Sequence, residues 1–338
     1  MSSSVLAKRI QTLSPSATLA VDAVVKKLER EGTKILNLSL GEPDFKTPEN
    51  IQNAAVTAMR EGYTHYTQTA GIPELRTVIS EKFRKENSID YDPSEIVVGV
   101  GSKQLLYHAM MALCGKDDEV LVPTPTWSTY VEQIRLAEAT PVCIQLQPPF
   151  RLRAQDIEKH ITPRTKAIIL NSPSNPTGAV IGKEELQKIG DLAVKHNFWI
   201  IADEIYEKLL YGGVHVSVAS LSDAIRARTI TINGFSKSYA MTGWRIGYAG
   251  GPKEVITAMV NLQSQTTSNT SSIAQYAAVE AITGDQKSLG IMKQEFEKRR
   301  EYLLDEFSRI PNLKVVEPDG AFYLFIHIEA SLHTGMKT

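Results

Sequence analysis

The sequence predicts an α/β fold in which a mostly parallel, seven-stranded sheet is covered by helices and joined to a smaller α/β domain. Short runs rich in β-branched residues alternate with amphipathic stretches of helical spacing, which favours a sheet with helices on both faces. The chain has 338 residues, enough for a large domain and a small one. Beyond Gly284 this alternation ends, and one long charged stretch follows.

The large sheet is expected from seven apolar runs, which lie at residues 95–100, 119–123, 141–146, 166–170, 198–203, 228–234 and 245–251. Helical spacing of apolar residues, with starts near Ser, Thr, Pro or Asp, predicts helices at residues 49–61, 72–86, 102–114, 126–137, 183–196, 253–265 and 271–284. In such folds the functional residues gather in loops at the carboxyl ends of the parallel strands. We therefore expect the site in those loops.

The last part of the chain predicts one long helix at 286–309 and one strand at 321–328. An apolar strand without a partner would leave a sticky edge, so we expect it to pair with a strand in 34–45. The predicted organisation is an N-terminal arm and part of a small domain in 1–46, a large domain in 47–285, and the start of a C-terminal small domain in 286–338.

Composition narrows the class of partner. Lys and Arg number 37 against 38 Asp and Glu, so the net charge of -1 offers no basic surface for nucleic acid. No apolar run approaches the length of a membrane span, and the N-terminus lacks the pattern of a secretory leader. Cys114 and Cys143 lie in apolar stretches without metal-type spacing and are expected to be buried, reduced thiols. These features predict a soluble cytoplasmic protein that binds small molecules or copies of itself.

The stretch GVGSKQ (99–104) is a strand end, glycines and a helix start, an arrangement that can cradle a phosphate at Gly101, Ser102 and Lys103. An ordinary strand-to-helix turn would have the same pattern. A dinucleotide fingerprint would need glycine where Gln104 stands, which weakens a nicotinamide interpretation.

Two more strand ends carry polar groups. NSPSNPTG (171–178) places Asn171 and Asn175 in a loop fixed by prolines, although an isolated turn would look the same. IIADEIY (200–206) ends a buried run with Asp203, and Tyr206 follows within reach of the same ligand. Asp203 could be a helix N-cap, or a carboxylate buried beside a cationic heterocycle.

In GFSKSYAMTGWRIGY (234–248), Lys237 lies among small and apolar residues, and Arg245 follows eight positions later. Partial burial would lower the pKa of this lysine and free its amine to form a Schiff base. The fork-shaped guanidinium of Arg245 suits a phosphate beside it. A lysine that extends to solvent and an arginine in a structural ion pair remain the alternative for either residue alone.

Taken together and in this order, the motifs resemble those of the class I, fold-type I pyridoxal-phosphate aminotransferases, in particular their aspartate/prephenate aminotransferase branch. The resemblance runs from about Leu13 to Ile328 and includes SATLAV, LGEPDF, YTQTAGIPELR, GVGSKQ, SPSNPTGAV, ADEIYE and GFSKSYAMTGWRIGY. It implies an aminotransferase that uses pyridoxal 5'-phosphate, with aspartate or glutamate as the amino donor and a 2-oxo acid as the acceptor.

The resemblance also implies roles for the residues that bind the cofactor. Lys237 would hold it as an internal aldimine and move the proton, while Asp203 would pair with its ring nitrogen. The other implied cofactor contacts are Tyr206 and Asn175 at the ring oxygen, Trp127 on the ring face, and Gly101, Ser102, Lys103 and Arg245 at the phosphate.

For the substrate and the assembly, the resemblance implies contacts by six residues. Gly41 would approach the substrate through its backbone, near Trp127 and Asn175, and Lys103 and Thr18 would receive a distal carboxylate. Tyr66 would reach the phosphate of a neighbouring subunit, so the resemblance predicts a homodimer whose active sites are shared across the interface. No metal is expected.

One element of the family pattern has no counterpart in this sequence. Family members grip the substrate α-carboxylate with an arginine from a late strand of the small domain, and the tail EASLHTGMKT does not continue that pattern. The resemblance therefore predicts a chain truncated at the C-terminus. It leaves open a catalytically impaired paralogue that only binds the cofactor, a prephenate aminotransferase, and a lyase of the same fold.

Overall fold

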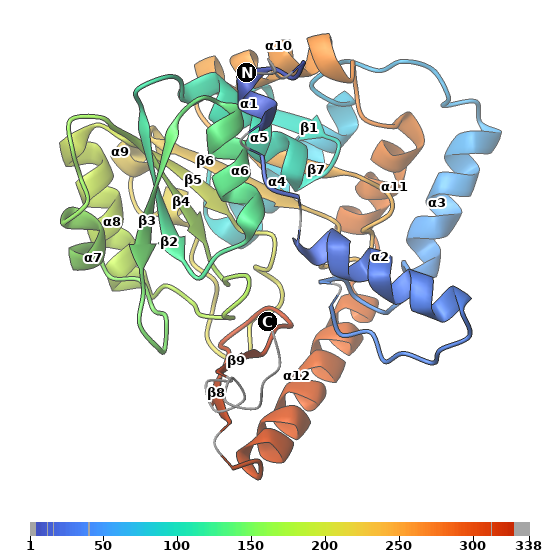
Figure 1. Ribbon diagram of the computed structural model, residues 1–338. Coiled ribbons are helices and arrows are strands. Elements are labelled where there is room, and N and C mark those ends of the chain that lie inside the picture. The colour runs from blue at the N-terminus through green and yellow to red at the C-terminus, as the bar shows by residue number, and fades with distance from the viewer. Residues whose placement is uncertain (1–4, 12, 16, 40, 312, 328–338) are drawn as a thin grey trace.

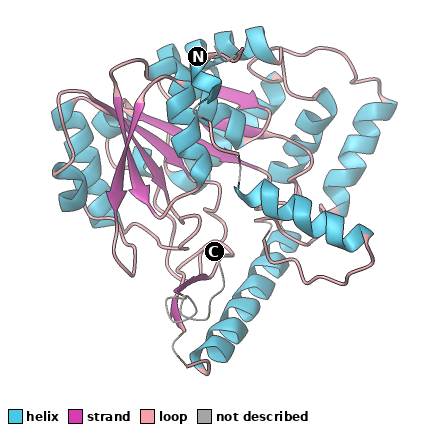
Figure 2. Ribbon diagram, in the orientation of Figure 1, coloured by secondary structure: helices cyan, strands magenta, loops and turns pink. Residues whose placement is uncertain are grey.

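The computed structural model describes residues 5–11, 13–15, 17–39, 41–311 and 313–327. Its centre is a seven-stranded sheet in the order β1-β7-β6-β5-β4-β2-β3 (Figures 1 and 2). All neighbouring strands are parallel except at β7, which is antiparallel to both β1 and β6. The strands are β1 (Ile96–Gly99), β2 (Glu119–Thr124), β3 (Thr140–Gln145), β4 (Thr165–Asn171), β5 (Trp199–Asp203), β6 (Thr229–Gly234) and β7 (Gly247–Gly250).

Helices cover both faces of this sheet (Figure 2). Helices α5, α6 and α10 share one apolar cluster with the sheet, α7, α8 and α9 share a second, and α3, α4 and α11 share a third. The helices are α1 (Lys8–Gln11), α2 (Ala17–Arg30), α3 (Glu49–Arg60), α4 (Pro73–Asn87), α5 (Ser102–Leu113), α6 (Ser128–Leu136), α7 (Ala154–Glu158), α8 (Lys183–His196), α9 (Asp223–Arg226), α10 (Lys253–Thr266), α11 (Ser272–Thr283) and α12 (Lys287–Ser308). The predicted α/β fold class is confirmed.

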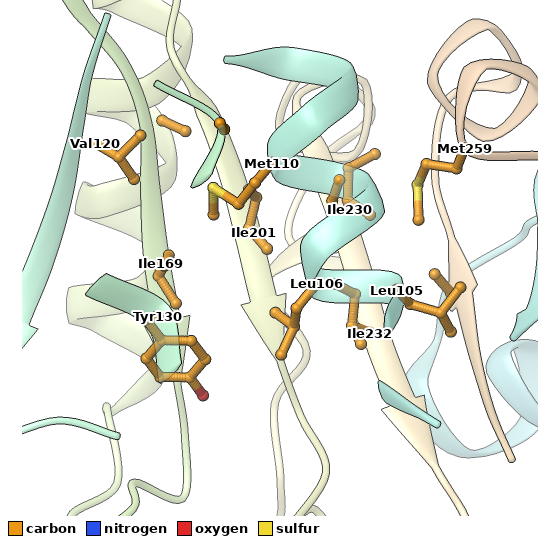
Figure 3. Close-up of a cluster of buried hydrophobic side chains, with 14 of the residues drawn as sticks. Leu105, Leu106, Met110, Val120, Tyr130, Ile169, Ile201, Ile230, Ile232 and Met259 are labelled. Atoms are coloured by element: carbon orange, nitrogen blue, oxygen red, sulfur yellow. The ribbon is translucent and has the colours of Figure 1, made fainter. Parts of the chain in front are cut away.

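The first of these clusters fixes α5 against the sheet (Figure 3). Leu105 and Leu106 of α5 are fully buried and pack with Ile230 and Ile232 of β6. Full burial of a leucine or isoleucine side chain contributes about 1.5–3 kcal/mol, so this contact holds the start of α5 firmly beside the end of β6. Tyr130 lies at the edge of the cluster, and its hydroxyl points away from it (Figure 3).

The C-terminal part corrects one prediction. Helix α12 projects from the large sheet, with the hairpin of β8 (Lys314–Val316) and β9 (Phe325–His327) beside it (Figure 1). The strand predicted at 321–328 is shorter than expected, and its partner is β8 rather than the N-terminal segment. The described residues 34–39 and 41–45 form no strand. Leu36 and Leu38, which suggested one, are each 86% exposed, so this apolar run pairs with nothing inside the described chain.

The structure also contains helices that were not predicted from the sequence, and α2 is the longest of them. None of the helices in the described ranges is both long and apolar enough to span a membrane. Both cysteines are free, but only Cys114 is partly buried, whereas Cys143 is exposed. The expectation of two buried thiols was therefore wrong for Cys143, which lies on the edge strand β3.

Candidate active site

A cavity of about 400 Å³ opens at the carboxyl ends of the parallel strands. The start of α5 and the loops after β2, β4, β5 and β6 each contribute side chains to it, and Ser39, Gly41, Glu42 and one residue near β9 complete the lining. Its lining is Ser39, Gly41, Glu42, Ser102, Lys103, Trp127, Tyr130, Asn175, Asp203, Ile205, Tyr206, Ser236, Lys237, Thr242, Arg245 and Tyr323. Nine of the residues predicted from the sequence are among them.

Lys237 lies in the loop after β6, and its Nζ donates a hydrogen bond to the backbone oxygen of Gly41. Burial lowers the pKa of this lysine to about 8, with the positive charges of Arg245 and Lys103 acting in the same direction and Glu42 and Asp203 opposing it. About a tenth of the amine is therefore unprotonated at pH 7, far more than for an ordinary lysine with a pKa of 10.5. A neutral amine is what a nucleophilic or proton-accepting lysine requires.

Asp203, the last residue of β5, is 2% exposed, and its Oδ2 accepts a hydrogen bond of 2.7 Å from the hydroxyl of Tyr130. Burial raises the pKa of Asp203 to about 6, although the hydrogen bond from Tyr130 and the charge of Lys237 lower it. No helix follows β5, and Oδ1 accepts only a turn contact of 3.3 Å from Ile205 N, so Asp203 is not a helix N-cap. A buried carboxylate of this kind is stabilised by a cationic partner.

Tyr206 and Asn175 converge on a third group in the cavity, the hydroxyl of Tyr323. The Tyr206 and Tyr323 hydroxyl oxygens lie 2.6 Å apart, and Asn175 Nδ2 donates to Tyr323 Oη at 3.2 Å. Asn175 itself is held by Asn171, whose Oδ1 accepts its backbone N–H at 2.7 Å. Three polar groups from three separate segments therefore point at one place, where they can hold a ligand oxygen.

The start of α5 provides an anion site. Gly101 precedes the helix with φ of 78°, and no described side chain caps it, so the first N–H groups of α5 are free to bind an anion. The guanidinium of Arg245 lies directly over this turn, because a Cβ on Gly101 would come within 2.7 Å of Arg245 Nη2. A phosphate group fits this pairing of helix start and guanidinium.

Lys103 and Trp127 form one wall of the cavity. The Lys103 ammonium lies 4.7 Å from the centre of the Trp127 ring, within the range of a cation–π contact. Burial of the ammonium lowers the pKa of Lys103, and the charge of Arg245 adds to this. The indole offers a flat apolar face, and the ammonium next to it offers a positive charge for an acidic ligand.

Three predicted residues lie outside the cavity lining. Gly101 underlies it at the start of α5, as described above. Tyr66 is 90% exposed and is not among the residues that line this chain's own cavity. Thr18 lies in α2, but its side chain falls outside the part of the chain that the structure describes.

Sequence reasoning missed Tyr130 and Tyr323. The signal for Tyr130 was present, because PTWSTY places it three residues after Trp127, one helical turn along the same face of α6. Tyr323 sits in the apolar run AFYLFIHI, where the residue types indicate only a strand. Its role became visible only once the fold had brought this segment to the loops after β4 and β5.

Comparison with known proteins agrees with this arrangement. The family model described as aminotransferase class I and II matches residues 33–337. An aspartate aminotransferase of Bacillus sp. (strain YM-2) is 47% identical over 98% of this chain and 86% of its own length. A probable aspartate/prephenate aminotransferase of Aquifex aeolicus is 47% identical over 95% of this chain and 82% of its own length.

The solved structure of an aspartate aminotransferase from Thermus thermophilus with maleate superimposes with a TM-score of 0.93 at 43% identity. It covers 96% of this chain, and this chain covers 85% of it. The resemblance read from the motifs, and the fold-type I architecture that it implied, are confirmed. By fold, by the matched family model and by these relatives, the chain belongs to the class I and class II aminotransferases and is a transferase enzyme.

Proposed function

We propose that this chain binds pyridoxal 5'-phosphate and transfers the amino group of aspartate or glutamate to a 2-oxo acid. The observation that carries the proposal is a single cavity that is lined by Lys237, with its lowered pKa, by the buried carboxylate of Asp203 and by an anion site at the start of α5. These are the three groups that a phosphorylated, cationic pyridine aldehyde requires.

The residues present fit this cofactor. The N–H groups of Ser102 and Lys103, which follow the turn at Gly101, would bind its phosphate together with Arg245, and Asp203 would pair with its ring nitrogen. Tyr206 and Asn175 would donate hydrogen bonds to its ring oxygen, and the Trp127 indole would pack on its ring. When bound, the cofactor supplies an electron-withdrawing ring that takes up the electron pair left by the substrate Cα–H bond.

Lys237 would have two duties in this reaction. Its amine would bind the cofactor covalently, and once a substrate amine had displaced it, the same Nζ would take the proton from the substrate Cα and return it to the cofactor side. The Gly41 carbonyl oxygen, which accepts a hydrogen bond from Nζ, orients the amine. Asp203 would hold the proton on the ring nitrogen.

The proposed donor is dicarboxylic because the cavity wall carries a cation apart from the groups assigned to the cofactor ring. Lys103 beside Trp127 offers a cation for a distal carboxylate, and Thr18 is proposed as its companion by family resemblance. The backbone of Gly41 borders the substrate space together with Asn175. The names of the relatives in Bacillus and Thermus, both aspartate aminotransferases, point in the same direction.

We further propose a cytoplasmic homodimer in which Tyr66 completes the phosphate site of the neighbouring subunit. Tyr66 is 90% exposed, and Leu36 and Leu38 are each 86% exposed, so one chain leaves unburied an aromatic ring and two leucines that a partner copy would cover. The proposed domains are the arm in 1–46, the large domain in 47–285 and the small domain from 286, consistent with α12 and its hairpin lying apart from the large sheet (Figure 1).

The two half-reactions test the function directly. Protein loaded with pyridoxal phosphate and mixed with aspartate alone should release one 2-oxo acid per active site and then stop, and the absorbance of the bound cofactor should return when 2-oxoglutarate is added. Continuous product release without any acceptor would indicate a lyase instead. A cofactor band that aspartate and glutamate leave unchanged would indicate a binding protein without turnover.

Prephenate is a second candidate acceptor, because relatives in Aquifex aeolicus and Thermus thermophilus carry the name aspartate/prephenate aminotransferase. The same assay distinguishes it, with prephenate in place of 2-oxoglutarate. Recovery of the original absorbance with prephenate would place this acceptor in the substrate range.

Covalent capture of the cofactor should depend on pH through Lys237. Because the pKa of its amine is lowered to about 8, the rate of capture should rise as pH increases from 6 and level off above about 8. An ordinary lysine would keep rising toward its usual value of 10.5. Stopped-flow absorbance of the cofactor-free protein with pyridoxal phosphate measures this midpoint, and one near 10.5 would show that Lys237 is not desolvated.

Tyr130→Phe should weaken cofactor binding without unfolding the protein. The change removes the hydrogen bond to Asp203, so the pKa of Asp203 rises further and its carboxylate becomes a weaker partner for a cationic ring. A lost hydrogen bond to a charged group corresponds to about a tenfold loss of affinity or more. Fluorescence titration with pyridoxal phosphate measures this. An unchanged dissociation constant would show that Tyr130 only fills space.

A further inference from the structure

The short segment 203–207 has two faces. Asp203 and Tyr206 line the cavity, whereas Glu204 and Glu207 lie outside its lining and are only 4% and 8% exposed. Two adjacent buried carboxylates are costly unless cations and hydrogen-bond donors compensate them. The structure provides that compensation on the side of the segment away from the cavity.

Glu207 is held from helix α4. Its Oε1 forms an ion pair with the Lys82 ammonium, and its Oε2 accepts a hydrogen bond of 2.7 Å from Asn87 Nδ2. Lys82 Nζ also donates to Asn87 Oδ1 at 2.7 Å, so the lysine and the asparagine are fixed to each other as well as to Glu207. Lys82 and Asn87 are themselves 6% and 5% exposed.

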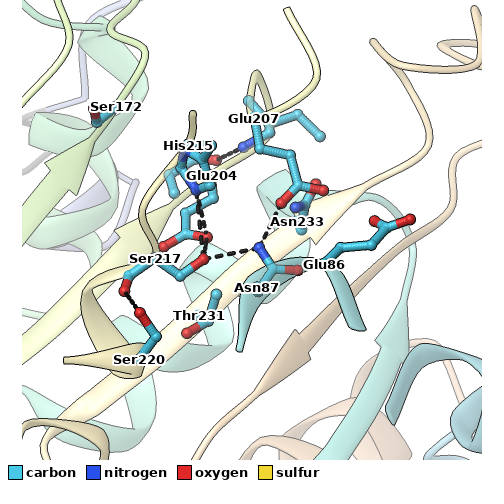
Figure 4. Close-up of polar contacts among 12 residues, drawn as sticks. Glu86, Asn87, Ser172, Glu204, Glu207, His215, Ser217, Ser220, Thr231 and Asn233 are labelled. Atoms are coloured by element: carbon cyan, nitrogen blue, oxygen red, sulfur yellow. Dashed lines mark hydrogen bonds and ion pairs between the residues drawn. The ribbon is translucent and has the colours of Figure 1, made fainter. Parts of the chain in front are cut away.

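Glu204 is held through the loop at 215–217 (Figure 4). Its Oε2 accepts a hydrogen bond of 2.5 Å from the Ser217 hydroxyl and lies 3.0 Å from His215 Nε2. The Ser217 hydroxyl in turn accepts the second N–H of Asn87 at 2.8 Å. Donors and acceptors match at every one of these contacts, so the two glutamates belong to one closed network.

The charges of the network also balance. Burial alone would lower the pKa of His215, but the charge and hydrogen bond of Glu204 outweigh it and raise that pKa. Burial alone would raise the pKa of Glu207, but the Lys82 ammonium outweighs it and holds that pKa low. The two buried carboxylates therefore face one ammonium and one readily protonated imidazole, while the more exposed Glu86, 3.6 Å from the Lys82 ammonium, is itself paired with Lys208.

Glu204, Glu207 and His215 lie close enough together to suggest a metal site, since their ligand atoms are all within 4.8 Å of one another. Their oxygens, however, already bind the Lys82 ammonium and the donors of Asn87 and Ser217. The cation of this cluster is thus a lysine of the chain itself, and the geometry favours a positional role over metal binding.

We propose that Glu204 and Glu207 are positioning residues, whose network fixes segment 203–207 so that Asp203 and Tyr206 face the cavity. The backbone supports this, because Glu204 N donates to Ile232 O at 2.9 Å and Glu207 N to Glu204 O at 2.9 Å, so a shift of either glutamate moves the segment. The benefit to cofactor binding rests on the proposed function, whereas the effect on the segment does not.

The test compares Glu207→Gln with Glu119→Gln. Glu119 is a matched control, since it is a 6% exposed carboxylate with a cationic partner, Arg164, and a hydroxyl partner, Thr162, but it lies at the start of β2, away from the cavity. Amide hydrogen exchange of the cofactor-free proteins is measured first. Glu207→Gln should speed exchange at residues 204–209 about tenfold, the effect of one lost charge-assisted hydrogen bond, and Glu119→Gln should leave these amides unchanged.

Titration with pyridoxal phosphate follows, and Glu207→Gln should raise its dissociation constant about tenfold while Glu119→Gln does not. Should Glu207→Gln not fold, Ser217→Ala breaks the network more mildly and is judged by the same readouts. Three results would overturn the positioning role. Glu207→Gln could leave exchange at 204–209 unchanged, Glu119→Gln could speed exchange there as much as Glu207→Gln does, or Glu207→Gln could speed exchange without changing the affinity for pyridoxal phosphate. If the wild-type protein takes up no pyridoxal phosphate, the proposed function is contradicted instead. Faster amide exchange in Glu207→Gln would then still show that the network fixes segment 203–207.

Discussion

Lys237→Ala should abolish amino transfer while leaving a folded protein that still binds pyridoxal phosphate weakly. The variant lacks the only amine proposed to bind the cofactor covalently and to move the Cα proton, and a positioned general base accounts for up to about 10⁴-fold in rate. Phosphate and ring contacts through Arg245, Asp203 and Tyr206 remain. Single-turnover mixing with aspartate measures the loss.

The folding stability of Lys237→Ala should not fall with its activity. Because the pKa of Lys237 is depressed to about 8 by burial, the folded state disfavours its charge below that pH, and the variant should be at least as stable as the wild type at pH 7. Lys103→Met is the matched control, since it removes the other ammonium of the cavity. It should weaken aspartate binding but leave covalent capture intact. Residual turnover in Lys237→Ala close to the wild-type rate would contradict the assignment.

Asp203→Asn should reduce amino transfer by about 10²–10³-fold, the range seen when one preorganised electrostatic partner is removed from a site. The amide is nearly isosteric and can still accept the hydrogen bond from Tyr130, so packing is kept while the negative charge is lost. Without that charge, the ring nitrogen loses the carboxylate that is proposed to keep it protonated. Half-reaction rates with saturating cofactor separate this loss from weaker binding.

The same substitution makes a prediction about stability with a definite sign. The pKa of Asp203 is raised from 3.8 to about 6 in the folded protein, so the wild type loses stability as pH rises through that interval. The asparagine variant has no such loss, and at pH 7 its cofactor-free form should be more stable by up to about 3 kcal/mol. Urea unfolding at pH 4 and pH 7 measures the difference. A less stable variant at pH 7 would indicate that the carboxylate serves the fold.

Site residues could be predicted from the sequence where the chemistry requires a particular residue type at the end of a strand. Lys237, Asp203 and Asn175 each follow a buried β-branched run, and parallel strands bring their carboxyl ends to one edge of a sheet. That rule alone places the three side chains in one cavity. Arg245 lies just before β7, and because β7 runs antiparallel to β6 its first residue pairs with the last residue of β6, which brings Arg245 to the same edge of the sheet and to the start of α5.

Features that depend on a partner distant in the sequence could not be predicted. The apolar residues Leu36 and Leu38 look like a strand, but a period of two does not say which edge accepts them, and here none in the described chain does. The network around Glu207 was equally hidden, because Lys82 lies 125 positions away in sequence and looks like an ordinary helix-surface lysine. Only the packing of α4 against the loop after β5 brings the two together.

Borohydride reduction followed by peptide mass spectrometry tests the central claim most directly. Protein incubated with pyridoxal phosphate, reduced and digested should carry the cofactor mass on the peptide that contains Lys237, at about one label per chain. The Lys103→Met control should give the same labelled peptide. A label on Lys103, a label spread over surface lysines, or no label at all would contradict the assignment of Lys237 as the lysine that binds the cofactor.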